Sequence, residues 1–404
     1  MPKAMIFLFD GTANDASEDR FSNVYAINQL IADRKTLRSG SSVRVKTQIT
    51  FYLPGVGTKF TVRKGASLFI RAIRTGEQYI FGDGVEQLIL RAYVNLSANY
   101  HPGDEIVIIG FSRGAAAARI FSRLVSDFGI LSSDMLLYLD RLWNEFVEIS
   151  RADNDAKYDN LILLLQGKLA EEARKTVFHK PKGKPIKFLG LFDTVAGPID
   201  NEVMEGVNFR DQYPAKGVEH IVHLLSMHEI RRAFVLKRFQ ISTAPHKTFK
   251  TLREIWVPGV HSDVGGGYLE NLISNVSLLT MCDKLEALGG IAIDRIAYSK
   301  IETEIKKKIE NARLVINSEG YENGPKQKRD DLIRKEDEIH PLHWYLLNKP
   351  VTWKRDEAPT TYVDRLGRPR ELKDRVLQRR FDRWVSADEL REPKKLRTNR
   401  RKQS

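Results

Sequence analysis

Short apolar runs alternate with amphipathic segments along most of this chain. The runs that predict buried strands are residues 4–9, 43–53, 106–109, 186–192 and 252–257. The segments with apolar residues three and four positions apart, which predict helices, are 24–31 (after the capping residues Ser22 and Asn23), 84–100, the alanine-rich stretch after Gly114, and several between about 130 and 180. Strand and helix patterns in this order predict an α/β fold with a mostly parallel sheet and helices on both faces.

The pattern changes near residue 285, where the chain becomes strongly charged and its periodicity helical, as over 301–309 and 330–338. We therefore expect an α/β domain over 1–285, with a helical insertion at about 130–180, and a charged, mostly helical region over 286–404. The insertion could act as a lid over a site or pack as ordinary core helices. Residues 341–347 are apolar and could dock on the core or on a membrane interface, and we expect docking on the core.

Charge and composition narrow the class of protein. The 404 residues carry a net charge of +13, and seven basic residues against one acid give 391–404 a charge of +6. Such a tail can contact anionic lipid or nucleic acid, or remain solvated. The lone cysteine, Cys282, excludes a disulfide framework and a multi-cysteine metal site. With no secretory signal and no long apolar run, we expect a soluble protein made in the cytoplasm, which a bacterial secretion system could export.

The chemistry centres on Gly110-Phe111-Ser112-Arg113-Gly114, between the strand 106–109 and the alanine-rich helix. In α/β hydrolases this strand–turn–helix is the nucleophile elbow, and glycines flank the serine because side chains there would collide with neighbouring backbone. Ser112 is therefore the predicted nucleophile, and the amide of Arg113 a predicted oxyanion donor. The alternative is an ordinary glycine-rich turn between a strand and a helix.

Two later strand ends supply partners for this serine. Asp193 follows the strand 186–192, and His261 follows the strand 252–257 just before three glycines, Gly265 to Gly267. The order serine, aspartate, histidine is that of the α/β hydrolases, so we predict a catalytic triad of Ser112, Asp193 and His261. Asp263 remains a second candidate for the acid.

The first strand ends in Asp10-Gly11-Thr12, which allows several interpretations. A haloacid-dehalogenase phosphatase needs a nucleophilic aspartate two residues before Asp10, and Leu8 stands there instead. The amides of Gly11 and Thr12 could complete an oxyanion hole with Arg113. The simplest alternative is an Asx-type turn at a strand end.

The sequence contains no strong pattern for a metal site or for a phosphate-binding loop. His220, His223 and His228 have helix-compatible spacing and could form a metal site with Glu229, but no further ordered set of ligands accompanies them. Residues 54–59 are glycine-rich but lack the spacing of a phosphate-binding loop. We therefore predict neither a metal nor a cofactor.

A set of short motifs together resembles one protein family. They are Phe9-Asp10-Gly11-Thr12, Asn23-Val24, Pro54-Gly55-Val56-Gly57-Thr58, Gly110-Phe111-Ser112-Arg113-Gly114-Ala115, Phe192-Asp193-Thr194-Val195, Glu229-Ile230-Arg231-Arg232 with Phe234, and Gly259-Val260-His261-Ser262-Asp263-Val264-Gly265-Gly266-Gly267-Tyr268. Over roughly residues 4–285 the chain resembles the DUF2235 family, the catalytic domain of Tle1-like phospholipase effectors of bacterial type VI secretion.

The resemblance implies an α/β-hydrolase-like catalytic domain that cleaves phospholipid acyl esters with a serine nucleophile. By position it implies Ser112 as the nucleophile, His261 as the histidine and Asp193 as the acid, with Asp263 also inside a motif. His228 stands where the family usually has an aspartate. Many effectors carry long C-terminal membrane-binding regions, whereas about 120 residues follow the matched part here.

Together these observations predict a serine esterase or lipase that hydrolyses acyl esters, above all phospholipids, through an acyl-enzyme. The expected partners are a phospholipid or other acyl-ester substrate, an anionic membrane surface and a secretion-system delivery partner; nucleic acid is not expected. Three alternatives stay open. They are a serine hydrolase on a soluble ester or peptide, a non-catalytic binding protein on a hydrolase scaffold, and a metal-dependent phosphoesterase that uses Asp10, the histidine cluster at His220 and Asp263.

Overall fold

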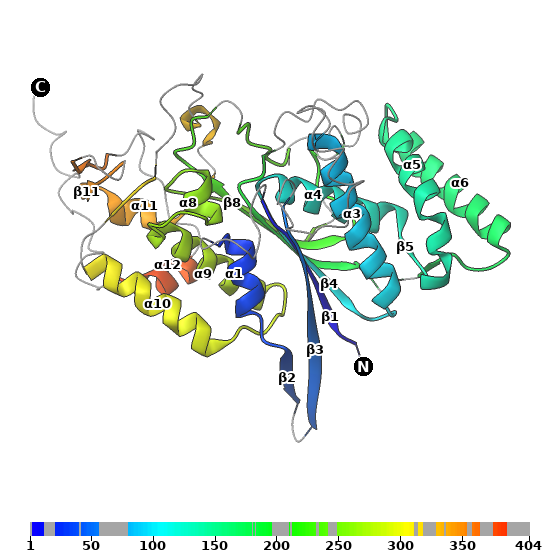
Figure 1. Ribbon diagram of the computed structural model, residues 1–404, viewed down its shortest axis with the longest axis horizontal. Helices are drawn as coiled ribbons and strands as arrows, with labels where there is room; N and C mark the ends of the chain where they lie inside the picture. Colours follow the sequence, from blue (N-terminus) through cyan, green and yellow to red (C-terminus); the bar gives the residue numbers. More distant parts are fainter. Residues whose placement is uncertain are drawn as a thin grey trace, which may run out of the picture.

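The computed structural model describes residues 2–11, 21–39, 42–55, 80–179, 181, 183–195, 210, 212–231, 234–240, 249–310, 314–317, 329–334, 337–353, 358–363 and 375–385. Within these residues an eight-stranded sheet runs through the middle of the molecule, with helices on both faces (Figure 1). Its strands are β1 (Ala4–Phe9), β2 (Arg34–Ser39), β3 (Ser42–Leu53), β4 (Glu105–Phe111), β7 (Ile186–Phe192), β8 (Val218–Ser226), β9 (Thr251–Val257) and β10 (Glu338–Ile339). The predicted α/β class and mostly parallel sheet are confirmed.

The strand order across the sheet is β10-β9-β8-β7-β4-β1-β3-β2. β1 pairs in parallel with both β3 and β4, and β7, β8, β9 and β10 then follow in parallel beyond β4. β2 runs antiparallel to β3. The winding direction therefore reverses between β1 and β4. In open α/β sheets, ligands bind at the carboxyl ends of the strands beside such a switch point.

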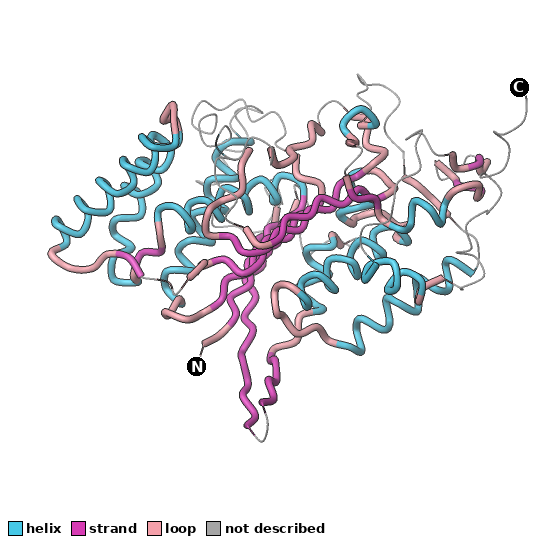
Figure 2. The backbone as a smooth tube through the Cα atoms, turned by 180° about the vertical axis from the view of Figure 1, so that it is seen from behind, coloured by secondary structure: helices cyan, strands magenta, loops and turns pink. Residues whose placement is uncertain are grey.

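Two groups of helices cover the sheet, one on each face (Figures 1 and 2). On one side lie α3 (Ile80–Asn99), α4 (Ser112–Arg123), α5 (Leu139–Ser150) and α6 (Asp155–Ala173); on the other lie α1 (Asn23–Leu30), α8 (His261–Gly265), α9 (Leu272–Ala287), α10 (Arg295–Glu310), α11 (Pro341–Leu346) and α12 (Arg375–Asp382). β1 shows why both faces are covered. Met5, Phe7 and Phe9 join one hydrophobic cluster, while the alternate residues Ala4, Ile6 and Leu8 join the other.

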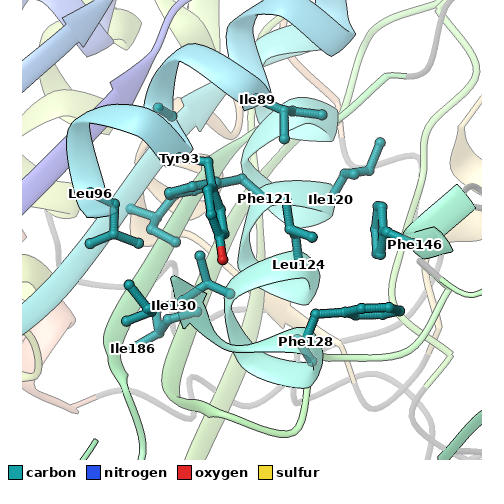
Figure 3. Packing of buried hydrophobic residues seen from close by; sticks show 14 of the residues in the cluster. Ile89, Tyr93, Leu96, Ile120, Phe121, Leu124, Phe128, Ile130, Phe146 and Ile186 are labelled. Atoms are coloured by element: carbon teal, nitrogen blue, oxygen red, sulfur yellow. The ribbon is translucent and has the colours of Figure 1, made fainter. Parts of the chain in front are cut away.

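The packing between α3, α4 and the sheet fixes the helix that follows Ser112. Phe121, in the last turn of α4, and Leu124, just past its end, lie in one buried cluster with Ile89 and Tyr93 of α3 (Figure 3). The hydroxyl of Tyr93 donates to the carbonyl of Gly129 at 2.7 Å, so its polar tip is paired although the ring is buried. Burial of each such side chain contributes about 1.5–3 kcal/mol to the hydrophobic term.

The region predicted as a helical insertion contains α5 and α6, preceded by a π-helical segment (Leu124–Phe128) and a 3₁₀ helix (Ser133–Tyr138). The short strands β5 (Ile130–Leu131) and β6 (Phe178–His179) pair with each other at its two ends. Trp143 and Phe146 of α5 are buried in the same cluster as α3 and α4. The lid role stays a prediction.

The residues beyond 285 also join the core. α10 agrees with the helix predicted over 301–309, and α11 lies buried in the second hydrophobic cluster, which confirms that 341–347 docks on the core. The helix predicted over 330–338 is wrong: its described residues form a 3₁₀ turn (Asp330–Leu332) and the start of β10, which pairs with β9. A small antiparallel pair, β11 (Pro350–Val351) and β12 (Thr360–Thr361), follows. The domain division at 285 stays a prediction.

One core strand differs from the sequence prediction. The segment with His220 and His223 is β8, not a helix, and it lies between β7 and β9. The predicted cap of α1 is confirmed, because the side chain of Ser22 accepts a hydrogen bond from the amide of Tyr25 at 3.1 Å. In the described part of the chain, none of the helices combines the length and the apolar character needed to cross a membrane.

Candidate active site

Ser112, Asp193 and His261 meet at the carboxyl edge of the sheet. Ser112 follows β4 and Asp193 follows β7, and the last residues of these neighbouring strands, Phe111 and Phe192, stand opposite each other. His261 opens α8 after the loop that leaves β9. Its Nε2 lies 2.8 Å from Oγ of Ser112, and its Nδ1 lies 2.6 Å from Oδ2 of Asp193. The structure thus joins the three side chains in one hydrogen-bonded chain.

The turn at Ser112 has the strained backbone expected of an elbow. Ser112 has a φ of 57°, a left-handed conformation that costs a non-glycine residue roughly 1–2 kcal/mol. A Cβ on Gly110 would lie 2.6 Å from Cα of Ala115, and one on Gly114 would lie 2.2 Å from the carbonyl oxygen of Asp10. Both glycines are therefore required by close backbone approach. Ser112 itself is 7% exposed.

Asp193 is fully buried and has several hydrogen-bond donors around its carboxylate. Oδ2 accepts from His261 and from the hydroxyl of Ser226 at 2.9 Å, while Oδ1 accepts from the amide of Ser226 at 2.8 Å and from the guanidinium of Arg329 at 2.6 Å. Burial alone raises the pKa of Asp193, but the Arg329 charge and the His261 hydrogen bond outweigh it and hold the pKa well below its usual range. The carboxylate is therefore ionised and fixed beside the imidazole.

A second histidine supports the backbone at this point. Asp193 has a φ of 40°, and the amide of the next residue, Thr194, donates to Nε2 of His223 at 3.1 Å. Burial lowers the pKa of His223, which fits a neutral ring that accepts at Nε2. Its Nδ1 lies 3.3 Å from Glu254, which in turn binds Arg238. His223 thus links the backbone after Asp193 to Glu254 and Arg238.

The described histidines do not form the metal site that was considered for them. His223 lies in β8, and Nδ1 of His228 accepts from the amide of Gly259 at 2.9 Å, in the loop that leads to His261. Among the described residues, no three or more histidine, cysteine, aspartate or glutamate side chains are arranged to hold a metal ion.

The imidazole of His261 is held by aromatic rings and by its own backbone. The ring centroids of Phe111 and Phe234 each lie 4.7 Å from that of His261. The amide of His261 donates to Oε2 of Glu229 at 3.1 Å, and Glu229 is itself paired with Arg231. Burial raises the pKa of Glu229, but the hydrogen bond and charge of Arg231 outweigh it and lower that pKa.

The glycines after His261 are needed for the same packing. A Cβ on Gly265 would lie 1.9 Å from the ring of Phe111, and Gly266, with a φ of 88°, would bring a Cβ within 2.5 Å of the amide of Asn23. The side-chain amide of Asn23 donates to the carbonyl of Val264 at 2.8 Å. Helix α1 is thereby fastened to the histidine loop.

Asp263 has a different set of partners from Asp193. Oδ2 accepts from the amides of Val260 and Asn317 at 3.0 Å each, and Oδ1 accepts from the side-chain amide of Asn317. Burial raises its pKa to about 6 despite these hydrogen bonds. In the described contacts it braces the α8 turn, whereas Nδ1 of His261 bonds to Asp193.

The loop after β1 reaches the elbow, since Gly114 packs against Asp10. The buried carboxylate of Asp10 accepts from the amide of Gly11 at 2.6 Å and from the hydroxyls of Ser22 and Tyr52 at 2.7 Å each. This is the turn-forming role considered for Asp10. Because the Gly11 amide bonds to Asp10 here, its oxyanion role stays a prediction, and Thr12 lies outside the described residues.

Arg113 is partly buried in the first turn of α4. Burial lowers the pKa of its guanidinium to about 10. The first amides of a helix lack partners within the helix and favour negative charge, so the position suits the oxyanion role predicted for the Arg113 amide.

The family model for the type VI secretion phospholipase effector Tle1-like catalytic domain matches residues 3–284. The chain belongs to this family. Ser112, Asp193, His261 and Asp263 all lie within the Tle1-like catalytic domain, whereas Arg329 and Asn317 lie beyond the matched residues.

Relatives of the Tle1-like domain extend beyond the length of this chain. The Saccharomyces cerevisiae protein named Uncharacterized protein YEL023C is 29% identical over 237 residues, which are 57% of this chain and 32% of that protein. An uncharacterized protein from Pseudomonas aeruginosa, known from a crystal structure, is 22% identical with a TM-score of 0.40 over 75% of this chain and 48% of its own. The Tle1 effector bound to the VgrG spike of the type 6 secretion system is 22% identical with a TM-score of 0.35, over 66% and 51%. This chain thus spans about a third to a half of these relatives.

Ser226 and Arg329, which donate hydrogen bonds to the Asp193 carboxylate, were not predicted from the sequence. Ser226 ends β8, the strand that was not predicted, and a serine after an apolar run at that strand end was an available signal. Arg329 lies in a charged stretch with no motif around it, so its contact with Asp193 could not be read from the sequence.

Proposed function

We propose that this protein is a serine esterase that hydrolyses the acyl esters of phospholipids. The observation that carries the proposal is the hydrogen-bonded chain from Oγ of Ser112 through His261 to the buried carboxylate of Asp193, within a Tle1-like catalytic domain. The strained Ser112 backbone and the strand–turn–helix around it support the nucleophile assignment.

The mechanism follows from the roles of these atoms. Nε2 of His261 accepts the Ser112 proton as Oγ attacks the ester carbonyl, and the protonated ring then gives that proton to the leaving alcohol. Water, activated by the same nitrogen, releases the fatty acid from the acyl-enzyme. Asp193 holds Nδ1 and stabilises the imidazolium, because its carboxylate is ionised and already fixed by Ser226 and Arg329.

The oxyanion that forms on the substrate needs donors at the same edge of the sheet. We assign this role to the amide of Arg113 and to the loop of Gly11 and Thr12, each donor contributing about 3 kcal/mol to transition-state stabilisation. The Gly11 amide would exchange its Asp10 carboxylate for the oxyanion during the reaction. Neither step requires a metal.

The choice of phospholipid over a soluble ester rests on the family. A basic C-terminal stretch of charge +6 over residues 391–404 would favour anionic bilayers, where such charges contribute about 1 kcal/mol each near the surface. Delivery by a type VI secretion system, with a spike protein as the partner, is part of the same proposal and rests on the family alone.

The proposal is tested by labelling with a fluorophosphonate probe, which reacts with activated serines. We expect the wild type to be labelled and Ser112→Ala to remain unlabelled. Asp193→Asn should slow labelling by roughly 10³- to 10⁴-fold, because the histidine loses the partner that fixes its tautomer. Asp263→Asn is the matched control and should slow it far less; the opposite ranking would assign the acid to Asp263. Labelling of Ser112→Ala equal to the wild type would refute the nucleophile.

A further inference from the structure

Arg329 lies 136 positions after Asp193 in the sequence and outside the matched catalytic domain, yet the two side chains are in direct contact. Its side chain is 3% exposed. Nη1 donates to Oδ1 of Asp193 at 2.6 Å and to the hydroxyl and carbonyl oxygens of Ser226 at 2.6 and 3.1 Å. Nη2 donates to the carbonyl of Phe234 at 2.9 Å, and Phe234 packs on His261. One guanidinium thus reaches the acid and the aromatic wall of the site.

We propose that Arg329 is a positioning residue that orients the Asp193 carboxylate toward His261 and compensates its buried negative charge. This inference rests on the proposed esterase function, since it concerns the same Ser112–His261–Asp193 chain. It also assigns part of the site to the region beyond the family match.

The hydrogen bonds around Asp193 support a role for Arg329 in orienting the carboxylate. The two carboxylate oxygens of Asp193 have different partners: Oδ2 accepts from His261 and the Ser226 hydroxyl, while Oδ1 accepts from Arg329 and the Ser226 amide. The planar guanidinium has donors in fixed directions, so with Nη2 on the carbonyl of Phe234, Nη1 is held on Oδ1 of Asp193 more firmly than a flexible ammonium would be. With Oδ1 held on that side, Oδ2 stays directed at Nδ1 of His261.

The charges around Asp193 support the second part of the proposal, in which the Arg329 cation compensates the Asp193 carboxylate. An ionised carboxylate with no solvent exposure needs compensating charge, and Arg329 supplies it beside the oxygen that does not face His261. A cation there opposes protonation of the nearby imidazole, which Asp193 alone would favour. The other charged or titratable groups around the pair are Glu229 with its partner Arg231, the buried His223 behind Thr194, Asp263 on α8 and Arg113 beside Ser112. Of the described contacts to the Asp193 carboxylate, the direct cationic one is from Arg329.

The test compares the full-length wild type with Arg329→Gln, Arg329→Lys and the control Arg253→Gln. Arg253 joins β9 to Glu338 of β10, so its loss also loosens the C-terminal region without touching Asp193. Hydrolysis of a short soluble acyl ester is followed from pH 5 to 9, and the ring protons of His261 are titrated by NMR over the same range.

In Arg329→Gln we expect the acid limb of kcat/KM, and the His261 titration with it, to move up by about one pH unit. The loss relative to wild type is then about tenfold at the foot of that limb. Arg329→Lys should keep the wild-type midpoint but lower kcat roughly ten- to a hundredfold with KM unchanged, because the fork is lost while the charge remains. Arg253→Gln should leave the midpoint in place.

An acid limb and a His261 titration in Arg329→Gln that coincide with the wild type would overturn the inference, whatever happens to the rate. If the wild type itself does not hydrolyse esters, the proposed function fails, and the NMR titration still decides the role of Arg329. If Arg329→Gln does not fold, Arg329→Lys still tests the proposal, because a kcat of Arg329→Lys equal to that of the wild type would overturn the positioning role of Arg329.

Discussion

Two buried aspartates flank His261, and their surroundings move their pKa values in opposite directions. At Asp193, the Arg329 charge and the His261 hydrogen bond outweigh burial and lower the pKa. At Asp263, burial outweighs the hydrogen bonds from Asn317 and Val260 and raises the pKa to about 6. A triad acid must stay ionised while it stabilises an imidazolium, so this contrast favours Asp193 over Asp263.

The same contrast predicts how stability depends on pH. The raised pKa of Asp263 means that the folded state holds a proton more tightly than the unfolded chain, so its contribution falls as the pH rises from about 4 to about 6. In full, this contribution of Asp263 to the free energy of unfolding is about 3 kcal/mol, since each unit of pKa difference is worth about 1.36 kcal/mol. The lowered pKa of Asp193 has the opposite sign, and its contribution is lost as the pH falls below about 4.

We therefore expect Asp263→Asn to lose this pH dependence. Urea unfolding at pH 4 and pH 6.5 should show the wild type losing about 2 kcal/mol more than the variant over that interval, because the variant has no carboxylate to ionise at this site. Asp140→Asn, at an exposed position of α5, is the control and should follow the wild type. Parallel pH profiles for wild type and Asp263→Asn would contradict the account.

The chain order of serine, aspartate and histidine at strand ends was visible in the sequence, and the structure brings these three residues into contact. Their distant supports could not be predicted. Arg329 and Asn317 contact Asp193 and Asp263 across 136 and 54 positions, and neither stands in a recognisable pattern. Such contacts depend on how the chain returns to the sheet, which local periodicity does not encode.

Among the elements, β8 shows how local pattern fails. Four of its five apolar residues, at 218, 221, 222 and 225, repeat the spacing of a helix face, and His220 and His223 are also three positions apart. Because β8 lies between β7 and β9 and is covered on both faces, its apolar residues need not alternate, so the usual strand signal is missing. The strands that were predicted, such as β1 and β7, are short apolar runs ended by turn residues.

The contact between the elbow and the α8 loop should be sensitive to a single methyl group. In Gly265→Ala the new Cβ would lie 1.9 Å from the ring of Phe111, which also packs on His261. We expect a loss of about 1–3 kcal/mol in unfolding free energy, together with a loss of fluorophosphonate labelling.

The control for this substitution is Gly167→Ala on α6. A Cβ there meets nothing within 4 Å, and alanine in a helix interior is favoured over glycine by about 0.5–1 kcal/mol, so stability should rise and labelling should not change. Thermal melts and labelling rates check both variants. Equal stability of Gly265→Ala and the wild type would contradict the described packing.

At the scale of the whole molecule, the site depends on parts of the chain that lie far apart. The family match ends at residue 284, but β10 extends the sheet beyond β9 and Arg329 contacts Asp193. The net charge of +13 is unevenly placed, since 391–404 carries +6 of it. A phospholipase that works at an anionic surface would benefit from such a charge, which raises its local concentration at the bilayer.

The most direct measurement is mass spectrometry of mixed phospholipid liposomes incubated with wild type and with Ser112→Ala, both in EDTA. We expect lysophospholipid and free fatty acid from the wild type and neither from the variant, since the serine forms the acyl-enzyme and no metal takes part. The position of the acyl chain that is lost then identifies the ester cleaved. The same products from Ser112→Ala would contradict the central claim.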